Sequence, residues 1–132
     1  MKKTWISLLV LACCACSPSV IPYNLDKKDV QAGSLIFRDN CTPCHGFAAQ
    51  GIVGPNLTDN HWIHGGGSAD ILKTITYGVP EKGMISWKDQ LKQSEIQQVA
   101  AYIMSLHDSK PANAKDAQGT FYSNLELKKA RQ

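Results

Sequence analysis

The strongest constraint on this 132-residue chain is the segment Cys41-Thr42-Pro43-Cys44-His45. The C-x-x-C-H pattern is the attachment signature of a c-type haem. Two thiols so close together can each form a thioether to a haem vinyl group, while the adjoining imidazole meets the iron. The segment therefore predicts a fold built around one covalently bound haem c, with His45 as an axial ligand.

Two other kinds of site use a C-x-x-C pair. A structural zinc site needs four ligands, usually a second cysteine pair or spaced histidines, and no second pair follows in this sequence. A thioredoxin-like redox pair needs a low-pKa thiolate and flanking βαβ patterns, which the sequence does not display. The motif therefore favours haem over zinc binding and thiol redox chemistry.

The N-terminus has the composition of an export signal. Residues 1–3 are Met-Lys-Lys, and residues 5–11 form a short apolar run that leads into small residues and cysteines. A membrane span needs about 20 apolar residues, and neither this run nor any later segment is that long. We expect a signal peptide over residues 1–12.

Val10-Leu11-Ala12-Cys13 resembles a bacterial lipobox, in which a cysteine after a small residue is acylated and becomes the new N-terminus. Cys13 is the first choice, and cleavage before Cys16 is the alternative. Cys14 is less favoured because Cys13 would then occupy the small-residue position. An ordinary secretory signal remains the other interpretation. We expect an exported protein, lipid-anchored on the periplasmic side of a bacterial membrane.

The charge balance excludes one class of partner. Loss of Lys2 and Lys3 with the signal leaves 12 of the 14 basic residues against 11 acidic ones. Basic clusters interleaved with aromatic residues, which nucleic-acid binding requires, do not occur. We expect no nucleic acid partner.

Composition divides the exported part of the chain into three segments. Residues 13–25, with two prolines, read as a flexible tether. Residues 26–107 carry the periodic patterns of a folded domain. Residues 108–132 are polar and predict a mobile tail, although four apolar residues in it can form a short docking segment: Phe121, Tyr122, Leu125 and Leu127.

Helical spacing of apolar residues recurs in three stretches of the domain. The first follows Asp26 or Asp29 as N-cap and leads into the haem motif. The second is capped by Ser68 and ends at Gly78, and the third covers residues 94–107, where Ser94 and Gln97 fit a capping box. The first stretch has these small or apolar positions: Val30, Gly33, Phe37 and Cys41.

Long loops fill the rest of the domain. Residues 46–67 are rich in glycine and turn formers, and residues 79–89 form a second loop that carries Met84. A domain of this size has a limited core, and a covalently held porphyrin gives it an apolar surface to bury. We expect an all-α fold without strands, in which three main helices and long loops surround one haem.

These residues resemble the class I cytochromes c. The family has a glycine and an aromatic residue two turns and one turn before the first haem cysteine, and Gly33 and Phe37 stand eight and four positions before Cys41. The resemblance implies that this pair packs against Val99 and Tyr102 of the last helix.

The family's G-P-N-L segment is present as Gly54-Pro55-Asn56-Leu57. The resemblance implies that this segment, with Asn56 and Leu57, contacts the cofactor, and that the Pro55 carbonyl accepts the imidazole N–H of His45. Such a bond fixes the tautomer of an iron-bound histidine and raises its basicity. Trp62 is expected to donate its indole N–H to a haem propionate, with a plain core aromatic as the alternative.

The resemblance puts the second axial ligand in the loop after the middle helix, where Met84 lies. The other methionine of the exported chain, Met104, is expected to fill a gap in the core. Three histidines are rival ligands in principle: His61, His64 and His107.

Within the class, the chain is most similar to the C-terminal haem domain of the diheme subunit of cbb3-type oxidases. The similarity rests on Trp62, the Gly65-Gly66-Gly67 run and Gly83-Met84-Ile85-Ser86-Trp87. That subunit also has a membrane span and a second C-x-x-C-H, and this sequence has neither. We expect a free-standing, lipid-tethered relative of the domain.

An iron bound by both His45 and Met84 has no open position for a substrate. The expected function is therefore a monohaem electron carrier of a bacterial respiratory chain, with redox proteins and a terminal oxidase as partners, no small-molecule substrate and no catalytic activity of its own. One alternative is a gas-binding sensor with a labile Met84. The other is an electron-transfer subunit of a larger oxidoreductase.

Overall fold

The computed structural model describes residues 26–123. The predicted signal peptide, the candidate lipid-anchor cysteines and the tether all lie outside this range, as do Leu125 and Leu127. The described elements, in chain order, are α1 (Lys27–Asn40), α2 (Thr42–His45), β1 (His61–Trp62), α3 (Ser68–Tyr77), the 3-10 turn η1 (Pro80–Lys82), α4 (Gln93–Ser105) and β2 (Thr120–Phe121).

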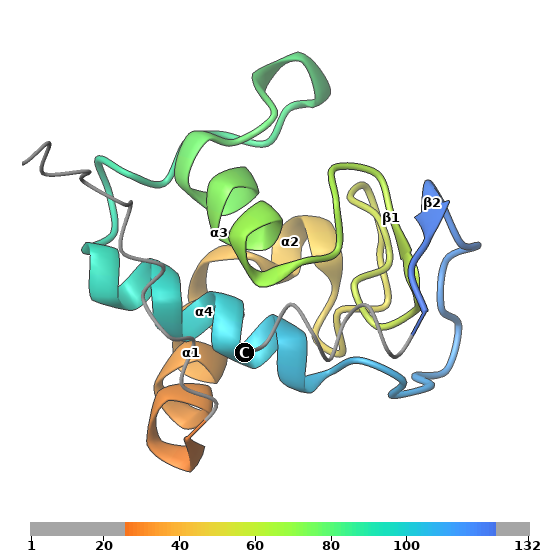
Figure 1. The fold of residues 1–132 in the computed structure, drawn as a ribbon, viewed down its shortest axis with the longest axis horizontal. Coiled ribbons are helices and arrows are strands. Elements are labelled where there is room, and N and C mark those ends of the chain that lie inside the picture. Colours follow the sequence, from red (N-terminus) through yellow and green to blue (C-terminus); the bar gives the residue numbers. More distant parts are fainter. Residues whose placement is uncertain (1–25, 124–132) are drawn as a thin grey trace, which may run out of the picture.

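The described part is mainly helical, as predicted, with four α-helices of which α2 is a single turn. Figure 1 shows α1 crossing α4, with α3 on the other side of α4. The loop between α2 and α3 and the segment after α4 lie at one end, and the loop between α3 and α4, which contains η1, extends away from them. After α1, the single turn α2 leads the chain into the loop that begins at Gly46. The C-x-x-C-H motif thus lies where α1 meets the loop that follows α2.

The crossing of α1 and α4 depends on a close backbone approach. A Cβ added to Gly33 would collide with the backbone carbonyl of Gln98. One turn later, the rings of Phe37 and Tyr102 lie 5.3 Å apart between centroids. Phe37 and Val99 are fully buried at this crossing. The contact fixes the end of α1, where Cys41 begins the haem motif.

Replacing Gly33 by alanine should therefore destabilise the domain. Overpacking costs about 1–3 kcal/mol, and here the obstacle is backbone, so α4 itself must shift. The higher helix propensity of alanine offsets about 1 kcal/mol of this loss in stability. We expect a lower urea midpoint for Gly33→Ala, whereas Gln31→Ala on the exposed face of α1 should leave it unchanged. Equal midpoints for the two variants would contradict this account of the crossing.

The helices begin with different caps from those predicted. In α4 the Glu95 carboxylate accepts the Lys92 backbone N–H at 2.7 Å, so Lys92 is the N-cap and Ser94 lies within the first turn. In α3 the Asp70 carboxylate accepts the Gly67 N–H at 3.2 Å. The longer acidic side chains reach back past the serines, so each helix starts one or two residues earlier than expected. Asp26 caps α1 as one of the two predicted candidates.

The expectation of no strands has to be corrected. The strands β1 and β2 pair antiparallel, with His61 opposite Phe121 and Trp62 opposite Thr120. Gly119 leads into β2 with φ +97°, and a Cβ there would collide with the Trp62 carbonyl. A short ribbon forms because glycine lets the returning chain lie directly against β1.

Residues 108–123, which we call the C-terminal strap, differ from the mobile tail expected for residues 108–132. Figure 1 shows the strap returning from α4 along the loops to β1. Three backbone hydrogen bonds of 2.8–2.9 Å hold it there: Asp108 N–H to Thr58 O, Lys115 N–H to Gln50 O and Tyr122 N–H to Asn60 O. The polar composition predicted mobility. The strap is nevertheless held in place, because backbone hydrogen bonds can form without apolar side chains.

Candidate haem site

The C-x-x-C-H motif forms one tight turn at the end of α1. The Cys41 N–H donates to the Phe37 carbonyl at 2.8 Å, and the His45 N–H donates to the Cys41 carbonyl at 2.9 Å. Pro43 lies in the first turn of α2, where a missing N–H costs nothing. Cys41 is half-buried and Cys44 exposed, and both are free thiols. The turn therefore offers two unpaired thiols and an imidazole from five consecutive residues.

The electrostatics of the Cys41 thiol do not suit a redox nucleophile. Burial raises the pKa of the Cys41 thiol to about 11, and the neighbouring Cys44 adds to the rise. Reactive C-x-x-C pairs have the opposite property, a thiol pKa lowered toward neutrality. The structure thus weakens the thioredoxin-like interpretation.

His45 is oriented by the loop that follows it. Its Nδ1 lies 3.0 Å from the Pro55 carbonyl oxygen, as the resemblance implied. A carbonyl only accepts, so Nδ1 carries the proton and Nε2 keeps its lone pair for a metal. Burial is the main cause that lowers the pKa of His45; the Pro55 bond opposes this, and the charge of Lys115 adds to it. The lowered pKa favours the neutral imidazole, which is its metal-binding form.

Gly54 allows the loop to approach the ring. A Cβ at this position would lie 2.6 Å from the His45 Cε1 atom. Any side chain there would push the loop away from the imidazole, and with it the carbonyl of Pro55.

Asn56 acts on the loop itself. Its amide oxygen accepts from the backbone N–H of Thr58 at 2.9 Å and from the Thr58 hydroxyl at 2.8 Å. Its amide nitrogen donates to Asp59 at 2.9 Å and to the Lys115 carbonyl at 3.3 Å. Leu57 is partly buried against the core. Of the predicted G-P-N-L contacts, the one to His45 is direct, and Asn56 orders the loop behind it.

Trp62 has a buried indole N–H donor that no residue of the described range accepts. Its side chain belongs to the core, and a Cβ on Gly66 would collide with its ring, so the indole is clamped in place. Among the described residues its Nε1 has no hydrogen-bond partner. Buried tryptophan N–H groups usually find an acceptor. An orphaned donor of this kind matches a ligand that brings its own acceptor, such as a propionate.

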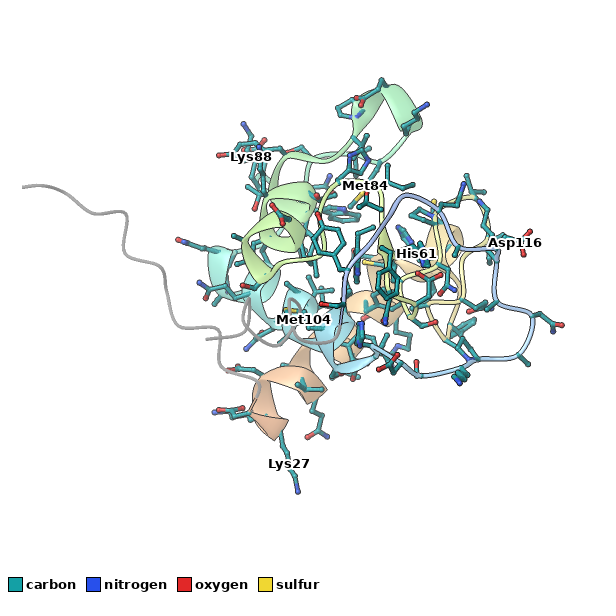
Figure 2. The ribbon with its side chains drawn as sticks, turned by 45° about the vertical axis from the view of Figure 1, so that its right-hand side comes forward. Lys27, His61, Met84, Lys88, Met104 and Asp116 are labelled. Atoms are coloured by element: carbon teal, nitrogen blue, oxygen red, sulfur yellow. The ribbon has the colours of Figure 1, made fainter. Side chains whose placement is uncertain are left out.

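Met84 lies in a braced loop after α3 (Figure 2). Backbone bonds of 2.8 and 3.2 Å join it to Val79 across the η1 turn, where Gly83 takes a left-handed φ of +83°. The Ser86 hydroxyl donates to the Thr76 carbonyl at 2.8 Å and ties the loop back to α3. Met84 is half-buried, whereas Met104 lies on α4 and is only 3% exposed.

Two of the three rival histidines have other contacts. The His61 ring packs edge-on against Phe121 at 5.4 Å between centroids. His107 Nδ1 lies 3.5 Å from an Asp108 carboxylate oxygen. His64 is exposed. Over residues 26–123, no three His, Cys, Asp or Glu side chains gather as a metal site.

Two parts of the site carried no recognisable signal in the sequence. Lys115 is one lysine in a polar segment, yet it contacts the loop next to His45. The second part is the hydrogen bond from the Ser86 hydroxyl to Thr76, which could not be predicted because a serine in a loop can bond many different acceptors. The hint that the chain returns to β1 was the apolar pair Phe121-Tyr122 of the possible docking segment.

The residues present fit a c-type haem. The turn supplies two thiols for thioethers, the Pro55 bond prepares one imidazole nitrogen for iron, a braced loop carries a thioether sulfur, and Trp62 offers an unsatisfied donor. These groups come from α2, β1 and the two long loops. Within residues 26–123 none of the helices has the length and apolar character to cross a membrane.

The chain is similar to curated subunits of respiratory oxidases. It is 36% identical over 94 residues to the cbb3-type cytochrome c oxidase subunit FixP of Azorhizobium caulinodans, covering 65% of this chain and 32% of that protein. It is 41% identical over 93 residues to the subunit CcoP of Rhodobacter capsulatus, covering 61% and 30%. The chain thus spans about a third of the length of these relatives.

A solved structure has a similar fold. Cytochrome cL from the marine methylotrophic bacterium Methylophaga aminisulfidivorans MPT aligns with a TM-score of 0.57 and 26% identity, over 74% of this chain and 73% of that one. Residues 28–103, more than half of the chain, match the family described as cytochrome c oxidase, cbb3-type, subunit III. The resemblance to the haem domain of this subunit is confirmed, and the chain belongs to that family of c-type cytochromes, which implies covalently bound haem c.

Proposed function

We propose that the chain is a monohaem c-type cytochrome that carries single electrons in a bacterial respiratory chain, to a terminal oxidase. Cys41 and Cys44 would hold the haem, and His45 and Met84 would bind its iron. The observation that carries the proposal is the 3.0 Å contact between His45 Nδ1 and the Pro55 carbonyl, beside two free thiols of the same turn.

Haem supplies one-electron chemistry at its iron when bound, and the protein adjusts the potential through axial ligands, hydrogen bonds and burial. Pro55 fixes the His45 tautomer and strengthens the imidazole as a donor. A methionine sulfur raises the potential relative to stronger donors. With His45 and Met84 both as iron ligands, the chain would transfer electrons without making or breaking a bond of a substrate.

The comparisons support the choice of partner. The most similar relatives reported above are named as subunits of cbb3-type oxidases, so a terminal oxidase is the proposed acceptor and another redox protein the donor. The proposed location is the periplasmic side of a bacterial membrane, with Cys13, or alternatively Cys16, as the lipid anchor.

A potentiometric titration tests electron carrying directly. One haem iron takes up one electron, so the haem absorbance should follow a Nernst curve of about 59 mV per tenfold change in the redox ratio. A Cys41–Cys44 dithiol would instead follow the two-electron slope of about 30 mV. The two-electron slope, or no redox transition in the visible spectrum, would overturn the proposal.

The second candidate is an electron-transfer subunit of a larger oxidoreductase. It is favoured by the relatives, since these are named as subunits and the chain matches about a third of their length. Purification from native membranes in mild detergent separates the two. A stoichiometric catalytic partner supports the subunit, and a stable monomer supports the carrier.

The orphaned donor of Trp62 gives a pH prediction. If its N–H bonds an ionised propionate, this bond lowers the propionate pKa. Trp62→Phe removes the donor and keeps an aromatic ring, so the pH-dependent part of the reduction potential should move to higher pH. Trp87→Phe is the matched control. Identical pH profiles for the two variants would contradict the assignment of Trp62 as a hydrogen-bond donor to the propionate.

A further inference from the structure

Lys115 of the C-terminal strap caps the loop that orients His45. Its ammonium nitrogen lies 3.3 Å from the Ile52 carbonyl oxygen, 3.1 Å from that of Val53 and 3.3 Å from that of Gly54. An ammonium group has three N–H donors, so each can face one carbonyl. Three consecutive carbonyls therefore converge on one cation.

The backbone of Lys115 contacts the same loop on both sides of this point. Its N–H donates to the Gln50 carbonyl at 2.8 Å, and its carbonyl accepts from the Asn56 amide at 3.3 Å. One residue of the strap thus contacts residues 50, 52–54 and 56.

The opposite side of the loop faces the haem motif. The Ile52 and Gly54 N–H groups donate to the Cys44 carbonyl at 3.1 and 2.9 Å, and the Gly51 N–H donates to the His45 carbonyl at 2.8 Å. Amides of the loop therefore hold the C-x-x-C-H turn while its carbonyls hold Lys115. The loop lies between the two, with Pro55 beside the His45 ring.

Burial of side chains contributes little to holding the loop of residues 50–56 in place. Ile52 is 56% and Val53 74% exposed. Its position depends on backbone hydrogen bonds, and those to a charged donor are stronger than those between neutral groups. Loss of the ammonium group would remove the bonds to the carbonyls of residues 52–54 and leave the backbone bonds of Lys115 and those from the loop to the motif.

We propose that Lys115 is a positioning residue of the haem site: by capping the carbonyls of residues 52–54 it keeps the Pro55 carbonyl on His45 Nδ1 and so fixes the orientation of the iron-binding imidazole. This inference rests on the proposed function, since it assigns His45 to iron. Lys115 itself contacts neither iron nor substrate.

The test compares Lys115→Met with Lys110→Met in the full-length, haem-loaded protein. Lys110 is an exposed lysine of the same strap, so its variant loses the same charge. Proton NMR of the reduced protein measures solvent exchange of the His45 ring N–H. We expect exchange about tenfold faster or more in Lys115→Met, because a charged hydrogen-bond donor is lost. Lys110→Met should exchange as the wild type does, and Lys115→Arg should largely restore protection.

Backbone amides separate a local effect from a general loss of stability. Exchange at Ile52 and Gly54 should accelerate in Lys115→Met, while Val99 in α4 should stay protected. Unchanged exchange at the His45 ring, or acceleration at Val99 equal to that in the loop, would overturn the proposal. The potentiometric titration of the same haem-loaded protein tests the proposed function separately. A two-electron slope would overturn that function, while loop amides that respond to Lys115→Met would leave the capping intact.

Discussion

Replacing Met84 by alanine is expected to lower the reduction potential and to open one axial position of the iron. A methionine sulfur favours the reduced state, and axial ligands span about 0.8 V of potential, so we expect a fall on the order of 0.1 V or more. The open position should bind carbon monoxide rapidly in the reduced protein. Potentiometry and gas-mixing kinetics measure the two effects.

Met104 provides the matched control. It is buried on α4, and Met104→Leu conserves its volume, so this variant should keep the wild-type potential and slow carbon monoxide binding. An unchanged reduction potential in Met84→Ala would show that Met84 is not a ligand of the iron. Fast carbon monoxide binding by the wild type would favour a gas-binding sensor with a labile Met84.

The second large effect is expected from the double variant Cys41→Ser, Cys44→Ser. Without thiols no thioether can form, so nearly all haem should be lost when the protein is unfolded. Haem staining after denaturing electrophoresis and the intact mass measure attachment. The fold should suffer as well, since a small domain depends on the porphyrin for much of its core.

The residue between the cysteines supplies the control for this pair. Pro43 is exposed in the first turn of α2, so Pro43→Ala should leave the covalent adduct intact. Haem that stays attached to the double variant under denaturing conditions would exclude the thioether assignment.

The main parts of the site could be predicted because each residue type carries specific chemistry. The motif at residues 41–45 needs no tertiary information, and the G-P-N-L segment pointed to the Pro55 contact that the structure has at 3.0 Å. The Gly33 and Phe37 spacing likewise anticipated the crossing with α4. In each case a short local pattern encodes a contact that few other residues can make.

The parts that the sequence did not reveal rest on backbone contacts. Lys115 caps carbonyls of residues far away in sequence, and carbonyls are common to all residues, so no pattern marks the loop as its target. The ribbon of β1 and β2 has two residues in each strand, too short for any alternation of apolar residues. The helix starts shifted because the Asp70 and Glu95 carboxylates accept the backbone N–H groups of Gly67 and Lys92, which precede the serines.

The visible spectrum of the purified protein, oxidised and then reduced, tests the central claim that His45 and Met84 bind one covalent haem. The account predicts low-spin spectra in both states, with the weak red-region band that a methionine sulfur produces on ferric haem. A high-spin spectrum without that band would contradict iron ligation by His45 and Met84. A protein without haem absorbance would favour the interpretation of Cys41 and Cys44 as a thiol redox pair.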